Sequence, residues 1–180
     1  MKQRLFLTGP IGCGKSTAIR QALGDRMDRC GGFLTRRCRE PHLHFTLERP
    51  DGTCMGTFLD FSGGRPEMDL SVFSNLDLTG KFLLLDEIGG IELLNPEFVT
   101  ALDAVLQADV PILGVLKGEG PAGALTESLG LAGDFEAAAA RLRQRLDGDA
   151  DTLVYHCGLY DETAMLLARQ WVEEYLYDRN

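Results

Sequence analysis

The stretch Gly9-Pro10-Ile11-Gly12-Cys13-Gly14-Lys15-Ser16 fits the pattern G-x-x-x-x-G-K-[ST] and follows the apolar run Arg4-Leu5-Phe6-Leu7-Thr8. The apolar run predicts a strand, and the pattern is typical of a phosphate-binding P-loop that joins a strand to a helix. In such a loop, glycines let successive backbone N–H groups turn inward around a polyphosphate, and the helix N-terminus adds positive potential. An ordinary glycine-rich turn is the alternative interpretation. The stretch therefore predicts a nucleotide-binding α/β domain.

The predicted nucleotide-binding residues are those of the loop and the start of the following helix: Gly9, Pro10, Ile11, Gly12, Cys13, Gly14, Lys15, Ser16 and Thr17. Lys15 is expected to place its charge against the β and γ phosphates, which makes it a candidate catalytic residue. The hydroxyl of Ser16 is expected to ligate Mg²⁺, the predicted cofactor.

The length and charge of the chain limit the classes of protein to consider. At 180 residues it has the size of one domain with a full hydrophobic core, so we expect a single domain over residues 1–180. The chain has 18 Lys and Arg against 27 Asp and Glu, a net charge of −9, and no block of basic residues stands out. Nucleic acid and anionic membranes are therefore not expected as partners, because binding to either depends on clustered Lys and Arg.

The cysteines and the apolar runs bear on the compartment. The five cysteines form no C-x-x-C pair and have no nearby histidine at ligand spacing, so we expect reduced thiols and a cytoplasmic protein. No apolar stretch approaches the roughly 18 residues that a membrane-spanning helix needs. The sequence accordingly predicts neither a signal peptide nor a membrane span.

The order of elements predicts an α/β three-layer P-loop domain with a mostly parallel sheet and an antiparallel extension over residues 31–59. Short β-like runs at 32–35, 42–47 and 53–59 predict a hairpin or meander in that extension. Segments 61–78 and 118–133 are predicted to be mainly loop, the first with at most one helical turn near 70–74. The remaining elements are helices at 16–23, Pro96–Gln107, 134–146 and 162–177, and strands at 82–85, 110–116 and 152–155.

The run Phe82-Leu83-Leu84-Leu85-Asp86-Glu87 has the form of a Walker-B strand, four apolar residues followed by two carboxylates. We expect Asp86 to hold Mg²⁺ opposite Ser16. Glu87 is then placed to accept a proton from the water that attacks the γ-phosphate, or to orient that water, which makes it the second candidate catalytic residue. A strand end capped by two carboxylates is the alternative, and the P-loop upstream favours the functional interpretation.

Three segments resemble the small P-loop nucleoside-triphosphatase family that includes the thermophile NTPases and the human cancer-related nucleoside triphosphatase. They are the P-loop, then Gly32-Phe33-Leu34-Thr35 with the downstream Arg39, and the block Asp86-Glu87-Ile88-Gly89-Gly90-Ile91-Glu92-Leu93. The resemblance implies slow Mg²⁺-dependent hydrolysis of ATP, GTP, CTP and UTP to the diphosphate and phosphate, with broad base tolerance.

Two departures from the family limit what the resemblance implies. The segment 67–80 is too short for the full helix that the family usually has before its Walker-B strand. Gly158-Leu159-Tyr160-Asp161 stands where the family tends to have an Asn-Arg pair near the base. Contacts to the base therefore cannot be carried over to this chain.

Arginines are candidates for a transition-state cation, because phosphoryl transfer accumulates charge on the γ-phosphoryl oxygens. Strand alternation places Arg37 and Arg39 on the same face of their strand, and solvated strand-edge arginines are the alternative. On the later helix Arg141 and Arg145 share a face and Arg143 points elsewhere, with a solvent-facing helix as the alternative. Lys117 is a further candidate to approach the γ-phosphate, and Glu92 either supports the strand-end loop or caps local backbone.

Three functions remain open from the sequence. The leading hypothesis is an NTP hydrolase in which Lys15, Ser16 and Asp86 bind Mg·NTP and Glu87 activates water. The second is a nucleotide or small-molecule kinase, which shares these residues and differs only in its acceptor site. The third is a nucleotide-gated binding module in which loop 63–74 or 118–133 contacts a protein partner, although no partner motif is visible.

Overall fold

The computed structural model describes residues 1–74, 76–118 and 121–176, and in this part of the chain eight strands form one sheet. The strands are β1 Arg4–Thr8, β2 Gly31–Cys38, β3 His44–Glu48, β4 Cys54–Asp60, β5 Glu67–Met68, β6 Leu83–Ile88, β7 Ile112–Leu116 and β8 Thr152–His156. The α-helices are α1 Lys15–Leu23, α2 Pro96–Gln107, α3 Pro121–Ser128, α4 Ala132–Gly148 and α5 Glu162–Leu176. Short 3-10 helices are η1 Gly24–Arg29, η2 Leu70–Phe73 and η3 Ile91–Leu94.

The sheet has a parallel half and an antiparallel half that meet at β2. Its strand order is β5-β4-β3-β2-β6-β7-β1-β8. Strands β2, β6, β7, β1 and β8 pair in parallel, whereas β3, β4 and β5 continue from β2 as an antiparallel meander. The predicted three-layer α/β domain with a mostly parallel sheet and an antiparallel extension is confirmed, and the extension continues past residue 59 to β5.

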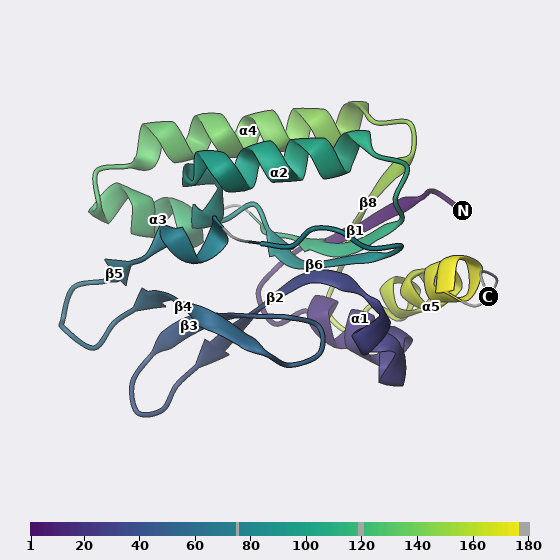
Figure 1. Ribbon diagram of the computed structural model, residues 1–180, viewed down its shortest axis with the longest axis horizontal. Helices are drawn as coiled ribbons and strands as arrows, with labels where there is room; N and C mark the ends of the chain where they lie inside the picture. Colours follow the sequence, from purple (N-terminus) through teal and green to yellow (C-terminus); the bar gives the residue numbers. More distant parts are fainter. Residues whose placement is uncertain (75, 119–120, 177–180) are drawn as a thin grey trace.

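Helices cover the sheet on both faces, as Figure 1 shows, with α2, α3 and α4 on one side and α1 and α5 on the other. Each face has its own apolar core. Phe98 of α2 and Leu142 and Leu146 of α4 belong to the first core, and Trp171 of α5 packs in the second with Ile19 of α1. Because the parallel strands are covered on both faces, they read as continuous apolar runs.

Helix α2 begins where the sequence predicts. The side chain of Asn95 accepts a hydrogen bond from the backbone N–H of Phe98 at 3.0 Å, and Pro96 occupies the first helical position. A proline fits there because its missing N–H would have no partner within the helix. The Asn95 amide also donates to the Leu70 carbonyl at 2.7 Å, which fastens η2 to the start of α2.

Two segments differ from the prediction. Segment 118–133 was expected to be loop, but it contains α3, and the glycines that suggested a loop are overridden by packing: Leu125 packs against the first core and Thr126 is buried. Segment 61–78 contains the two-residue strand β5 in addition to the expected helical turn, which is η2. The parts of these predictions that fall on Asn75, Glu119, Gly120 and Tyr177 lie outside the described residues.

None of the described helices combines the length and the apolar character required to cross a bilayer.

Candidate functional site

The P-loop lies between β1 and α1, at the carboxyl end of the parallel strands. Gly9, Gly12 and Gly14 have positive φ values of 140°, 80° and 100°, a region that residues with a Cβ rarely adopt. Position 9 also has no room for a side chain, because a Cβ there would lie 2.5 Å from the carbonyl oxygen of Cys157. Helix α1 starts directly after this loop without a side-chain cap, so its first N–H groups point toward the space above the loop.

The Lys15 side chain folds back over the loop. Its ammonium donates to the carbonyl oxygens of Gly9 at 2.9 Å and Pro10 at 2.8 Å, and lies 3.6 Å from the Cys13 sulfur. Only 9% of Lys15 is exposed. The charge is therefore already held at the loop, where a phosphate oxygen can take the place of a carbonyl partner.

Asp86 and Ser16 are 70 residues apart in sequence and in direct contact in the fold. The Ser16 hydroxyl donates to Asp86 Oδ1 at 2.9 Å. Asp86 is 2% exposed, and its Oδ2 is buried without a hydrogen-bond partner, with the Arg20 guanidinium 3.9 Å away. Burial raises the pKa of Asp86 to about 6, and the bond from Ser16 and the nearby Arg20 limit the rise.

This pair of oxygens suits a hard divalent cation. A buried carboxylate oxygen that lacks a partner and a serine hydroxyl beside it are the oxygen ligands that Mg²⁺ takes from a protein in a nucleotide site. The described residues contain no group of three or more His, Cys, Asp or Glu placed to hold a metal. Such a group is not needed where phosphates and waters complete the coordination.

Glu87 is held by Lys117, which follows β7. The two side chains form an ion pair, with Glu87 Oε1 and Lys117 Nζ 2.7 Å apart, and both are partly exposed. The backbone N–H of Lys117 donates to the Ile88 carbonyl at 2.7 Å, which fixes the end of β7 against the end of β6. The candidate base therefore has a defined position beside Asp86.

Two adjoining cavities open at this edge of the sheet. The larger, about 860 Å³, lies over the P-loop and is lined by Lys15, Gly118 and His156 among others. The smaller, about 370 Å³, reaches from Ser16 and Asp86 toward the meander. Four residues line both cavities: Arg37, Phe45, Glu87 and Lys117.

Glu92 is buried at the wall of the smaller cavity. It is 4% exposed, and its Oε1 accepts hydrogen bonds from the N–H groups of Gly89 at 2.6 Å and Gly90 at 2.7 Å. Burial raises its pKa, partly offset by these bonds and by Lys117. These bonds fit both roles considered from the sequence, because the local backbone that Glu92 caps is the loop at the end of β6.

The structure separates the predicted arginines into two groups. Arg37 lines both cavities, with its guanidinium carbon 6.0 Å from the centre of the Phe45 ring, and Arg143 lines the larger cavity and donates to the Lys117 carbonyl at 3.2 Å. Arg39 and Arg141 are not among the described residues that line either cavity. Arg39 is exposed and lies one residue beyond the end of β2.

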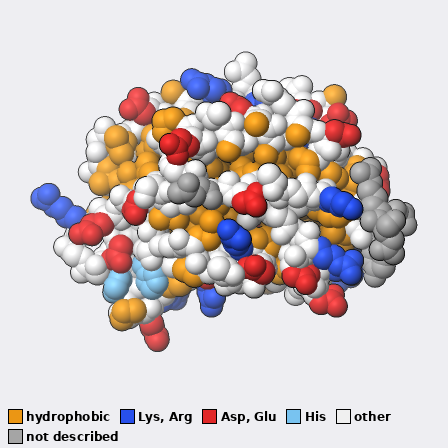
Figure 2. Space-filling view, viewed as in Figure 1, with side chains coloured by type: hydrophobic (Ala, Val, Ile, Leu, Met, Phe, Trp, Pro, Cys, Tyr) orange, Lys and Arg blue, Asp and Glu red, His pale blue; other side chains and the backbone are white. Residues whose placement is uncertain are grey.

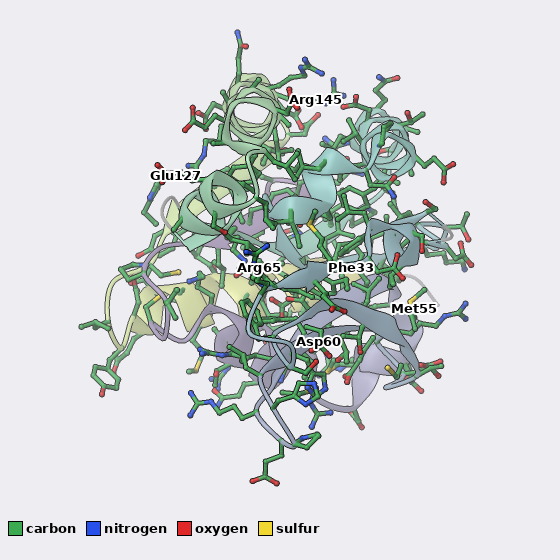
Figure 3. All side chains as sticks on the ribbon, turned by 90° about the vertical axis from the view of Figure 1, so that its left-hand side faces the viewer. Phe33, Met55, Asp60, Arg65, Glu127 and Arg145 are labelled. Carbon is green, nitrogen blue, oxygen red and sulfur yellow. The ribbon has the colours of Figure 1, made fainter. Side chains whose placement is uncertain are left out.

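Arg141 lines neither of these cavities, because α4 turns it to the opposite side from Arg143, and its catalytic role stays a prediction. With Arg145 it lines a separate cavity of about 80 Å³ that is also formed by Val99, Leu102 and Asp103 of α2. Figure 3 shows Arg145 in the outer helical layer, far from Asp60 of the meander. The predicted separation of Arg141 and Arg145 from Arg143 is thus confirmed.

Sequence reasoning missed the apolar walls of the smaller cavity and the position of Arg20. Thr35 belongs to the Gly-Phe-x-Thr segment and lines this cavity, as do Phe45 and Phe58 of the next two strands. The available signal was strand alternation, which places Phe45 and Leu43 on one face and His42 and His44 on the other. Alternation cannot show that this face lies against the P-loop.

The charges on the molecular face in Figure 2 are mixed, with Lys and Arg scattered among Asp and Glu. The histidines visible on that face belong to the edge formed by the meander, where His42 Nε2 lies 2.9 Å from Asp60 Oδ2. The expectation that nucleic acid is not a partner stays a prediction.

Comparison with known proteins gives a consistent set of relatives. The sequence matches no protein-family model. It is 30% identical over 132 residues to the nucleoside-triphosphatase THEP1 of Methanocaldococcus jannaschii, covering 63% of this chain and 77% of the relative. It is 27% identical over 139 residues to THEP1 of Thermococcus kodakarensis, covering 64% of this chain and 77% of that protein.

Two solved structures share the fold over nearly the whole chain. The crystal structure of THEP1 from Aquifex aeolicus superposes with a TM-score of 0.63 at 17% identity, covering 98% of this chain and 99% of that one. The solution structure of a human cancer-related nucleoside triphosphatase superposes with a TM-score of 0.58 at 22% identity, with the same coverage of both chains. With the P-loop, the Walker-B carboxylates and these relatives taken together, the chain belongs to the THEP1 family of P-loop nucleoside-triphosphatases.

Proposed function

We propose that this protein hydrolyses nucleoside triphosphates to diphosphate and phosphate in a Mg²⁺-dependent reaction with broad base tolerance. The observation that carries the proposal is the Ser16–Asp86 contact at 2.9 Å, with a buried Asp86 oxygen left without a partner and Glu87 as the next residue. The THEP1 relatives are named nucleoside-triphosphatases, which supports the same reaction class for this chain.

The P-loop would hold the triphosphate. Its positive-φ glycines aim backbone N–H groups at the phosphates, and the uncapped start of α1 adds its positive end. Lys15 would exchange its bonds to Gly9 and Pro10 for bonds to the β and γ phosphates. An exchange of partners avoids the cost of leaving a buried ammonium without acceptors.

Ser16 and Asp86 would hold Mg²⁺, and their oxygens fit this role for the reasons given above. When bound, Mg²⁺ neutralises the negative charge that develops on the phosphate oxygens. Glu87 would orient the attacking water and accept its proton, while Lys117, 2.7 Å from the carboxylate, would keep it in position. Arg37 and Arg143, which both line the larger cavity, are the candidate transition-state cations.

The loop between β8 and α5 stands where the resemblance would place a contact to the base. The carboxylate of Asp161 accepts hydrogen bonds from the N–H groups of Gly158, Thr163 and Ala164, so it is committed to the backbone. The side chains of Leu159 and Tyr160 are 70% and 95% exposed. Neither side chain lines the larger cavity, so the proposal of broad base tolerance rests on the resemblance to the family and is tested with the four nucleotides below.

We also propose that the enzyme works in the cytoplasm. All five cysteines are free, two of them buried, and a reducing compartment keeps thiols in that state.

The first test is phosphate release from ATP, GTP, CTP and UTP, with Mg²⁺ and without any acceptor. We expect release from all four nucleotides, and loss of release on addition of EDTA. Glu87→Gln should lower kcat by about 10² to 10⁴ while Mg·ATP binding persists, because general-base catalysis contributes on that order. Lys15→Ala should weaken nucleotide binding and abolish release.

Glu136→Gln is the matched control, since Glu136 is exposed on α4. Native protein that binds Mg·NTP yet releases no more phosphate than Lys15→Ala would contradict hydrolysis. Release that survives Glu87→Gln would reject the role of Glu87 while leaving hydrolysis in place.

A further inference from the structure

The smaller cavity is larger and more apolar than hydrolysis requires. Water attack needs room for one water molecule, about 30 Å³, beside Glu87. The cavity measures about 370 Å³. Its apolar lining consists of Leu43, Phe45, Phe58, Leu59, Phe61, Ile91 and Leu125.

The walls come from elements that pack independently of the catalytic residues. Phe45 of β3 lies at the centre of an aromatic group, with ring centres 6.2 Å from Phe58 and 6.3 Å from Phe61. Leu125 of α3 and Ile91 of η3 line the cavity from the helical layer. A site of this size with aromatic walls is typical of pockets that bury a small organic ligand.

The polar end of the cavity coincides with the reaction centre. Ser16, Asp86 and Glu87 line it, and Glu87 also lines the larger cavity over the P-loop. A ligand in the smaller cavity would therefore place its polar end where the γ-phosphate of a nucleotide in the larger cavity ends. The arrangement would bring two ligands to the same carboxylate, that of Glu87.

The charged residues that line the smaller cavity determine which class of ligand it can bind. Three carboxylates, Asp86, Glu87 and Glu92, line the smaller cavity against two cations, Lys117 and Arg37. Lys117 is engaged by Glu87 at 2.7 Å, and Arg37 is exposed at the rim. With Asp86 holding Mg²⁺ in the proposed function and Glu87 paired with Lys117, the buried Glu92 is the carboxylate of this lining that keeps its charge, and the remaining wall is mainly apolar. Such a lining disfavours a phosphorylated or carboxylated ligand and permits a neutral one.

We propose that the smaller cavity binds a second substrate, a neutral aromatic alcohol of up to nucleoside size, whose hydroxyl takes the place of water and receives the γ-phosphoryl group. The proposal rests on the nucleotide and cation sites of the proposed function, and it extends that function from hydrolysis to kinase activity. Glu87 serves both reactions as the proton acceptor.

The transfer step balances without another reactant. The hydroxyl oxygen forms a bond to the γ-phosphorus as the bond from that phosphorus to the β–γ bridging oxygen breaks. The bridging oxygen keeps the electron pair and leaves as the nucleoside diphosphate. The hydroxyl proton passes to the Glu87 carboxylate, and the second product is a phosphate monoester.

The test incubates the full chain and Mg·ATP with thymidine, adenosine and 4-hydroxybenzyl alcohol, with thymidine monophosphate as the anionic comparison. Phosphorus NMR separates the phosphate monoester from free phosphate. We expect monoester from at least one neutral compound and none from thymidine monophosphate. Neither binding nor phosphorylation of any neutral compound at millimolar concentration would overturn the proposal, as would preferred phosphorylation of thymidine monophosphate.

A cavity-filling variant locates the ligand. Leu125→Trp adds bulk at a half-buried wall position of the smaller cavity and should weaken binding of the neutral compound about tenfold or more. Phosphate release without an acceptor should stay within about twofold of native, because water needs little of the space. Leu43→Trp fills the same cavity from the meander and replaces the first variant if that one does not fold.

Leu166→Trp is the control, on an exposed position of α5. Unchanged binding of the neutral compound in both filled variants would overturn the assignment of the cavity. Phosphate release without an acceptor reports on the hydrolase proposal separately, so failure of that reaction and failure of the acceptor site give different results.

Discussion

Burial of Asp86 lowers the stability of the folded protein, and its neighbours offset only part of this loss. It is almost completely buried, and one of its oxygens accepts no hydrogen bond. Its pKa rises from an ordinary value of 3.8 to about 6, mainly because of burial. A carboxylate whose pKa is raised by burial makes the fold less stable at neutral pH, which is the cost expected for the proposed cation site.

Asp86→Asn should therefore stabilise the protein in EDTA at pH 7 while removing Mg²⁺-dependent nucleotide binding. Because the folded pKa lies above the unfolded one, the stabilising effect of protonation is complete below pH 3.8 and lost as the pH rises through about 6. The variant should gain about 3 kcal/mol at pH 7, or roughly 6 to 12 °C in Tm, and less than about 1 kcal/mol near pH 4.

Thermal unfolding at the two pH values measures this difference, with Asp25→Asn, at an exposed position of η1, as control. A variant no more stable than native at pH 7 would show that the unpartnered oxygen is not a source of strain.

At the residue scale, the sequence was sufficient to predict the P-loop between β1 and α1 and the position of Asp86 opposite Ser16. A motif with a fixed glycine, lysine and serine spacing dictates local backbone geometry, and two carboxylates after an apolar strand must lie at the same sheet edge as that loop. No such motif exists for the arginines, so the sequence could not show which of them line the cavities. Arg37 and Arg39 share a strand face, and the different positions of their side chains depend on where β2 ends.

The β8–α5 connection shows how one side chain organises an element. Asp161 directly precedes α5, and its carboxylate accepts bonds from the N–H groups of Thr163 at 3.0 Å and Ala164 at 3.2 Å, and from Gly158 at 2.9 Å. The bond from Gly158 is the main reason why the pKa of Asp161 lies below its usual 3.8. The residue both starts the helix and closes the loop that carries Tyr160.

Asp161→Ala should lower Tm by about 2 to 4 °C at pH 7, the usual size of a lost helix cap in a domain of this length. Because the folded pKa is lowered, the contribution of Asp161 is present above pH 3.8 and is lost as the pH falls below it. Melting curves of native and variant should therefore converge near pH 3. Asp151→Ala, exposed just before β8, is the comparison variant, and equal losses in the two variants would argue against a cap.

Among the elements, long periodic segments were predictable and short ones were not. Helix α2 begins and ends where its cap, its proline and its apolar spacing place it. Helix α3 was missed because Gly123 and the neighbouring glycines lower its local helix propensity, while the contacts of Leu125 with the core exist only in the folded chain. Strand β5 is two residues long, and its only signal is its pairing with β4.

At the scale of the whole molecule, Arg4 ties three segments together at the end of β1 opposite the P-loop. Its Nη1 donates to Asp149 Oδ2 at 2.7 Å and its Nη2 to the Ala108 carbonyl at 2.7 Å, and only 5% of the residue is exposed. These bonds join β1 to the ends of α2 and α4. They stabilise the amino-terminal end of β1 without contact with the nucleotide site.

Arg4→Met keeps the apolar stem and removes the charge, so it should cost about 2 kcal/mol; the partly exposed Asp149 keeps some access to water, which limits the loss. Urea unfolding should show a lower midpoint with an unchanged slope. Phosphate release per folded molecule at 25 °C should match native. Arg169→Met, exposed on α5, is the control, and a fall in kcat for Arg4→Met would mean that this edge communicates with the site.

Strand β2, where the parallel and antiparallel halves of the sheet meet, separates the phosphate-binding residues from those that form the aromatic walls of the smaller cavity. The P-loop, Asp86, Glu87 and Lys117 all belong to the parallel half, whereas the aromatic walls of the smaller cavity come from one uninterrupted segment, the meander. A lineage could thus exchange that segment by a single recombination event, or let it diverge freely, and inherit the phosphate chemistry intact. Architectures divided in this way favour the emergence of enzymes that share one energy-yielding reaction but differ in the molecule it is applied to.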